Sequence, residues 1–202
     1  MRLWQNPASP FARKVRIVAR EAGLAARIEE LGTMVSPVSP NADLATRNPL
    51  VKIPALELDD GSVLYDSTVI CDYLDSLNTG AKLIPAGAAR WPALRLQALC
   101  NGILEAAVLC RYESAVRPEE YRWKNWSDGQ FIKIRNGLDG LEREVAGWGD
   151  RFHIGQIAAA CVTGYLDFRY ASEPWRDTRP QLAAWHKAIL ARASVAATVP
   201  AA

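Results

Sequence analysis

The chain has 202 residues, half of them hydrophobic, and a formal net charge of +2. This length suits one large domain or two small ones, and the apolar content is sufficient for a core without disulfides or metal ions. Lysines and arginines are scattered, and no run is dense enough to favour nucleic acid or a membrane surface as a partner. No N-terminal signal segment and no uncharged stretch of bilayer length is present. We therefore expect a soluble, cytoplasmic protein.

The cysteines bear on redox and metal chemistry. The chain contains Cys71, Cys100, Cys110 and Cys161, all within apolar, helix-like sequence. They form no C-x-x-C pair, and the two histidines complete no zinc-binding spacing with them. Because free cysteine behaves as a small hydrophobe, the sequence predicts buried, reduced thiols and no metal site.

The first predicted elements are a strand over residues 2–5, "RLWQ", and a helix that begins near Pro10. Ser9 suits the N-cap of this helix, and proline suits its first position because the missing N–H would be unpaired there. Apolar residues recur three or four apart along the helix, the basic residues between 13 and 20 lie mostly off that stripe, and Gly23 follows as a stop. By local pattern alone, Ser9 is a helix cap and nothing more.

Up to about residue 78, short strands alternate with helices. "ARIEEL" over 26–31 predicts a second strand, and the prolines at 37 and 40 indicate a loop. Strand candidates over 53–58 and 62–66 flank Asp59-Asp60-Gly61, which is the pattern of a hairpin. A further helix opens at Ser67. This order of elements predicts a small α/β layer over residues 1–78.

Residues 79–89 form a turn-rich linker, and nearly everything beyond them has helical period. One long helix is predicted from 91 to about 116, and a second carries an apolar stripe through 131–148. A third, from 154 to about 169, is apolar all round in its first turns, as at the centre of a bundle. A last helix includes Leu182 and Ile189, and the tail from Ser194 is expected to fray. We predict an all-helical region over 90–202.

Four separated motifs occur in one order along the chain. They are Ser9-Pro10-Phe11-Ala12, Asn48-Pro49-Leu50-Val51-Lys52-Ile53-Pro54-Ala55-Leu56, Asp66-Ser67 and His153-Ile154-Gly155-Gln156-Ile157-Ala158-Ala159-Ala160. The set spans essentially the whole chain and resembles the glutathione S-transferases, most closely their bacterial serine-type members. The resemblance implies a thioredoxin-like N-terminal domain that binds glutathione, an all-helical C-terminal domain that shapes the second-substrate pocket, and a homodimer.

The resemblance also implies an enzyme that binds glutathione as co-substrate and transfers it to a small, largely apolar electrophile. It places the glutathione thiol at Ser9, where related disulfide-exchange proteins read C-P-x-C; without either sulfur, disulfide exchange at this site is excluded. A free thiol has a pKa of about 8.5, and a hydrogen bond of ~1.5–3 kcal/mol plus a helix end of ~0.3–1 kcal/mol bring that pKa to around neutrality. Ser9 is thus expected to donate to sulfur and not to act as a nucleophile.

The residues implied to bind glutathione are Phe11, Lys52, Ile53, Pro54, Asp66 and Ser67. The stretch Lys52-Ile53-Pro54 resembles the family's cis-proline corner, which leaves the main chain of Ile53 free to pair with the peptide. The alternative is an ordinary proline at the first residue of a strand. Lys52 is a candidate for the glycine carboxylate, and a solvated surface lysine is the alternative. Val51 stands where relatives usually have glycine.

The second predicted helix of the α/β layer offers the other half of the implied site. Its N-terminus presents free N–H groups and partial positive charge, which suit the γ-glutamyl carboxylate. Ser67 is expected to be its N-cap, with or without a ligand role. Asp66, where relatives usually have glutamate, is expected to face the ligand's ammonium group. His153 and Gln156 replace the family's usual Ser/Thr and Asp, so a weaker cap is expected on the core helix.

Two alternatives remain open on the sequence. One is a non-catalytic binding or regulatory protein of the same fold, since a fold alone does not settle function. The other is a different glutathione-dependent reaction, namely isomerisation, dehalogenation, ether cleavage or peroxide reduction. The second-substrate pocket is expected to draw on Phe11 and on residues 104–112, with Arg111, Tyr112 and Trp123 as further candidates.

Overall fold

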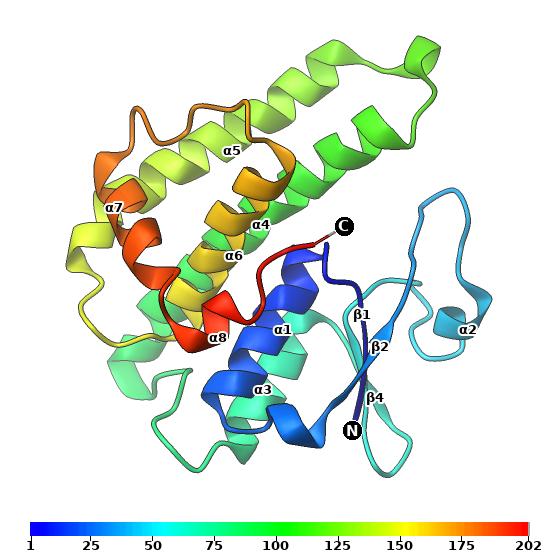
Figure 1. The fold of residues 1–202 in the computed structure, drawn as a ribbon, viewed down its shortest axis with the longest axis vertical. Coiled ribbons are helices and arrows are strands. Elements are labelled where there is room, and N and C mark those ends of the chain that lie inside the picture. Colours follow the sequence, from blue (N-terminus) through cyan, green and yellow to red (C-terminus); the bar gives the residue numbers. More distant parts are fainter. Residues whose placement is uncertain (202) are drawn as a thin grey trace.

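The computed structural model describes residues 1–201, with an α/β part followed by a helical part (Figure 1). The sheet contains β1 (Arg2–Gln5), β2 (Glu29–Gly32), β3 (Ala55–Glu57) and β4 (Val63–Leu64), in the order β2-β1-β3-β4. β1 pairs in parallel with β2, whereas β1–β3 and β3–β4 are antiparallel. Helices α1 (Pro10–Glu21) and α3 (Ser67–Leu77) lie between the sheet and the helical part, and α2 (Ala42–Ala45) is a single turn. The predicted fold class is confirmed.

The helical part contains α4 (Arg90–Ala115), α5 (Lys124–Glu144), α6 (Ile154–Arg169), α7 (Pro180–Ile189) and α8 (Ala193–Ala196). Short 3-10 turns occupy Ala25–Arg27, Gly87–Ala89, Glu119–Tyr121 and Val145–Gly147. α6 lies between α4 and α1, and every residue over 154–166 is buried. This explains why its sequence is apolar all round instead of striped.

Two expectations about helix ends are wrong. The tail from Ser194 does not fray, because α8 packs against α1 with Val195 and Thr198 buried. Arg192 forms a two-pronged ion pair with Glu21 at 2.8 and 2.5 Å, which clamps this turn to the end of α1. The cap of α6 is complete: His153 Nδ1 accepts from the Gly155 N–H, and Gln156 accepts from the His153 N–H.

The four cysteines are free and buried, as predicted. Burial raises the pKa of Cys71 to about 12 and that of Cys161 to about 11, so these thiols stay protonated at neutral pH. Within residues 1–201, no three His, Cys, Asp or Glu side chains are placed to hold a metal ion together. Residues 87–115 are long and apolar enough for a membrane span, but this is weak evidence because α4 packs against α5 and α6 as a core helix does.

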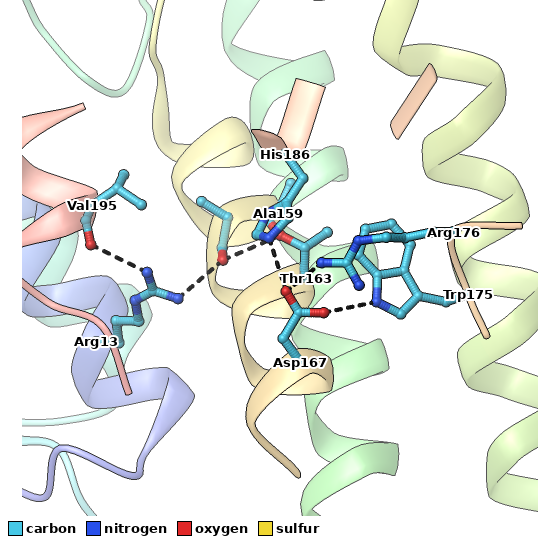
Figure 2. Close-up of polar contacts among 9 residues, drawn as sticks. Arg13, Ala159, Thr163, Asp167, Trp175, Arg176, His186 and Val195 are labelled. Carbon is cyan, nitrogen blue, oxygen red and sulfur yellow. Dashed lines mark hydrogen bonds and ion pairs between the residues drawn. The ribbon is translucent and has the colours of Figure 1, made fainter. Parts of the chain in front are cut away.

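Asp167 fastens the later helices to α6 (Figure 2). Its carboxylate accepts hydrogen bonds from Trp175 Nε1 at 3.1 Å and Arg176 Nη2 at 2.5 Å, and it contacts His186 Nε2 at 3.0 Å. Burial alone raises the pKa of Asp167, but the hydrogen bonds from His186, Arg176 and Trp175 outweigh it and hold that pKa well below its ordinary value. This carboxylate is therefore ionised at neutral pH and holds α7 and the loop before it on the bundle.

Helix α1 connects the two parts of the molecule through a buried arginine. Arg13 Nη1 donates to the carbonyl of Ala160 in α6, and Nη2 donates to the carbonyl of Val195 in α8, each at 3.3 Å (Figure 2). Gly164 lies one turn after Ala160, and a Cβ there would overlap Nη1 of the guanidinium. The glycine therefore makes room for the arginine.

We predict that Gly164→Ala destabilises the protein by about 1–3 kcal/mol, because the added methyl group must displace the Arg13 guanidinium from its carbonyl partners. The measurement is chemical unfolding followed by circular dichroism. Gly129→Ala in α5 is the matched control: nothing lies within 4 Å of its new Cβ. That variant gains up to about 1 kcal/mol from helix propensity. Equal midpoints for Gly164→Ala and the unaltered protein would contradict the steric assignment.

Candidate functional site

The sheet register brings three of the sequence motifs to one edge. Trp4 pairs with Ala55, and Leu56 pairs with Leu64. Because both pairings are antiparallel, the end of β1, the start of β3 and the end of β4 lie on the same side of the sheet. The segments attached there contain Ser9, Ile53-Pro54 and Asp66-Ser67. Residues up to 58 positions apart in sequence are thus neighbours in the fold.

Ser9 is the N-cap of α1, as the local pattern predicted. Its Oγ accepts from the Ala12 N–H at 3.2 Å, and its own N–H donates to the Asn6 carbonyl at 2.9 Å. The cap uses a lone pair of the oxygen and leaves the hydroxyl hydrogen free. Within residues 1–201 that hydrogen has no acceptor. Capping and donation to a ligand are therefore compatible roles for the same half-buried side chain.

The Ile53–Pro54 peptide bond is cis, as the resemblance implied. The side chain of Asn48 shapes this corner: its amide donates to the Lys52 carbonyl at 2.8 Å, and its Oδ1 accepts from the Leu50 N–H at 3.0 Å. Inside residues 1–201, the main chain of Ile53 forms no hydrogen bond, so its N–H and C=O are available to an extended peptide. Lys52 is exposed.

The start of α3 differs from the prediction by one residue. Asp66, and not Ser67, is the N-cap: its Oδ1 accepts from the Thr68 N–H at 2.8 Å, and Ser67 is the first helical residue, with 2% of its surface exposed. The preceding carboxylate reaches the first-turn amides better than the buried hydroxyl does. The N–H groups of Ser67 and Val69 have no partner in the described part of the chain. This helix end can therefore still receive an anion.

Lys14 is a buried cation that the sequence analysis did not single out. It is fully buried, its Nζ donates to Asn101 Oδ1 at 2.9 Å, and it lies 5.9 Å from the centroid of the Phe11 ring. Asn101 Nδ2 in turn lies 3.5 Å from Thr68 Oγ1 in the first turn of α3. No carboxylate in residues 1–201 forms an ion pair with Lys14. The side chain of Asn101 therefore connects this positive charge to the first turn of α3.

The open side of the site faces α4 and α6. The contacts of Lys14 with Asn101 and of Arg13 with Ala160 place α1 beside both helices, and α1 runs opposite to them (Figure 1). The start of α1 therefore lies opposite the later turns of α4 and α6. Tyr112 is half-buried on this stretch of α4, whereas Trp123, another candidate, is exposed at the start of α5.

Comparison with known proteins decides the family. Residues 8–77 match the glutathione S-transferase N-terminal domain, and residues 124–188 match the glutathione S-transferase C-terminal domain. The uncharacterized GST-like protein YibF of Escherichia coli K12 is 31% identical over 99% of this chain and 98% of its own length. The chain belongs to the glutathione S-transferase family.

Two crystal structures of family members from Pseudomonas fluorescens Pf-5 show what such proteins bind. One contains bound glutathione, is 50% identical, and superposes with a TM-score of 0.97 over 100% of this chain and 99% of that one. The other contains bound S-(propanoic acid)-glutathione, is 48% identical, and superposes with a TM-score of 0.92 over the whole of both chains. Both relatives thus hold glutathione or a glutathione thioether.

We predict that Lys14→Met weakens glutathione binding about tenfold while the free protein stays as stable as before or gains stability. Methionine fills a similar volume without a buried charge, whereas the bound tripeptide loses a nearby cation. The two quantities are measured by titration calorimetry and chemical unfolding. Lys187→Met, which removes an exposed lysine of α7, is the matched control. Equal affinities for the Lys14→Met and Lys187→Met variants would rule out a contribution of the buried charge.

Proposed function

We propose that this protein is a serine-type glutathione transferase that holds glutathione at the sheet edge, stabilises its thiolate through Ser9 and transfers the sulfur to a small, largely apolar electrophile. The observation that carries the proposal is the free hydroxyl hydrogen of Ser9 at the N-terminus of α1. That position combines a hydrogen-bond donor with the positive end of a helix, and both favour an anionic sulfur.

The rest of the glutathione-binding role is assigned to the residues of the same edge. The main chain of Ile53, beside Pro54, pairs with the peptide of glutathione in the manner of an added strand. The N-terminus of α3 at Ser67 receives the γ-glutamyl carboxylate, and Asp66 faces the ammonium group. Lys52 reaches the glycine carboxylate. Phe11 borders the sulfur from the first turn of α1.

Chemistry at the sulfur needs no protein nucleophile. Once the thiol is ionised, its sulfur forms a bond to the electrophilic carbon, and the leaving group departs from that carbon with the electron pair of the broken bond. The protein contributes proximity and stabilisation of the negative sulfur. The relative with bound S-(propanoic acid)-glutathione supports a site with space for a group attached to sulfur. The absence of both C-P-x-C thiols excludes disulfide exchange by protein thiols at Ser9.

We predict that Ser9→Ala raises the pKa of bound glutathione by about one to two units and lowers turnover with a chloronitrobenzene, because the sulfur loses a hydrogen-bond donor. Ultraviolet absorbance of the thiolate, followed against pH, measures that pKa. The Ser9→Thr variant keeps the hydroxyl, so the pKa of bound glutathione is expected to stay as low as in the unaltered protein. Since Ser9→Ala also removes a cap worth about 1 kcal/mol, the absorbance is read at saturating glutathione on folded protein. An unchanged thiolate titration would refute the role of Ser9.

We further propose a cytoplasmic homodimer. The four free thiols fit a reducing compartment. A groove of about 460 Å³ between α3 and α4 is lined by Leu64, Val69, Tyr73, Ile84 and Leu94 among others, and Val69 is 47% exposed. Such an exposed apolar surface suits a second copy of the chain.

We expect light scattering to give twice the chain mass, and Val69→Glu to give the mass of one chain, because a charge at this face opposes its burial in an interface. Val38→Glu, at another exposed valine (75% exposed), is the control, and we expect it to leave the measured mass at twice that of one chain. A single-chain mass for the unaltered protein at micromolar concentration would reject the dimer.

A further inference from the structure

Two arginines on the open side of the site have no acidic partner. Arg111 lies in the last turns of α4, and Arg169 is the last residue of α6. Neither forms an ion pair within the described residues, whereas most arginines of the helical part do, for example Arg117, Arg135 and Arg192. The Nε of Arg169 is buried and has no hydrogen-bond partner in that part of the chain. Both guanidinium groups therefore retain donors for a ligand.

The ends of α4 and α6 form one wall of the site, which consists of Arg111, Tyr165, Phe168, Arg169 and Tyr170. The Tyr170 hydroxyl donates to the Ala107 carbonyl at 2.6 Å, which ties the end of α6 to α4 one turn before Arg111. Tyr165 lies beside Tyr170, with ring centroids 6.3 Å apart. The Arg169 guanidinium lies 4.0 Å above the Phe168 ring, a stacked arrangement that leaves its edge free to bind in the ring plane.

Charge on this wall is positive. Burial raises the pKa of Tyr165 to about 12, and the nearby charges of Arg169 and Arg111, together with a hydrogen bond from Arg169, act against that rise. Glu113 is the next carboxylate along α4, but residues two apart on a helix do not share a face. Its oxygens are occupied by Arg117 Nε at 2.6 Å and the Trp123 N–H at 2.8 Å. The wall therefore presents two cations that Glu113 does not neutralise.

The wall lies on the second-substrate side of the sulfur. Ser9 begins α1, which faces the later turns of α4 and α6, and those turns carry Arg111, Tyr112 and Arg169. A group attached to the sulfur would extend from Ser9 toward these side chains. A planar, two-pronged anion is the partner that a guanidinium binds best.

We propose that Arg111 and Arg169 bind a carboxylate on the second substrate, so that the electrophile is a small carboxylic acid whose apolar part lies against the aromatic rings of the same wall. This inference rests on the proposed function, because it assumes that glutathione sulfur is placed at Ser9. The two arginines then select which electrophile is accepted, while Ser9 activates the thiol.

Two glutathione thioethers test the proposal: one carries a 2-carboxyethyl group on sulfur and the other a propyl group. We expect calorimetry to show the unaltered protein binding the carboxyethyl compound about tenfold more tightly. Arg111→Met and Arg169→Met lose most of that preference while their affinity for glutathione itself is unchanged. Because the proposed contact joins opposite charges, we expect the preference for the carboxyethyl compound to shrink at high salt.

Arg143→Met is the matched control, since it removes an exposed arginine at the C-terminal end of α5. It retains the full preference for the carboxyethyl compound. Equal binding of the two thioethers by a protein that still binds glutathione would overturn this inference alone. Absence of glutathione binding altogether would overturn the proposed function. Loss of preference in the Arg143→Met variant equal to that in Arg111→Met would also reject a specific carboxylate site.

Discussion

The buried guanidinium of Arg13 is the contact on which the arrangement of the site depends. It bonds to a carbonyl of α6 and a carbonyl of α8, so the helix that begins at Ser9 is fixed against the helical part of the molecule. Burial lowers the pKa of Arg13, but an arginine remains charged at neutral pH. Two carbonyl groups accept from its Nη atoms, and its buried Nε has no hydrogen-bond partner within the described residues. The position of Ser9 relative to α6 and α8 follows from this connection, and the Lys14–Asn101 contact fixes it relative to α4.

Lys14, the next residue, is buried by different means and with a different consequence. Arg13 has two carbonyl acceptors from separate helices, whereas the ammonium of Lys14 has one amide oxygen and the face of an aromatic ring. A buried charge with so little compensation is costly in the free protein. An anion bound at the start of α3, as proposed for the γ-glutamyl carboxylate, would offset part of that cost. Binding and stability are thereby opposed at this residue, which is the expected behaviour of a functional site.

Much of the fold was predictable, because helical and strand periodicities directly reflect which faces are buried. The order of the elements and the corner before Pro54 were predicted from local patterns and the family resemblance. Features that depend on contacts between residues far apart in the sequence were not predictable. Nothing near Ser194 predicts that Arg192 will meet Glu21, and the cap of α3 depends on whether Ser67 is buried. The burial of Lys14 was not predictable either: the basic residues of α1 lie mostly off its apolar stripe, yet the packing of the helix buries Arg13 and Lys14 as well.

The environments of sulfur in this protein explain why its hydroxyl, and not one of its thiols, suits the site. Cys71 and Cys161 are enclosed in apolar surroundings, and burial raises the pKa of each to about 12 and about 11 respectively. A glutathione thiol at Ser9 would meet a hydrogen-bond donor and a helix N-terminus, which lower a thiol pKa. The same functional group is therefore shifted in opposite directions at positions a few helical turns apart. At neutral pH these buried thiols stay protonated. Under the proposed function the bound tripeptide is ionised at the same pH, so an electrophile would react with glutathione and leave the protein unmodified.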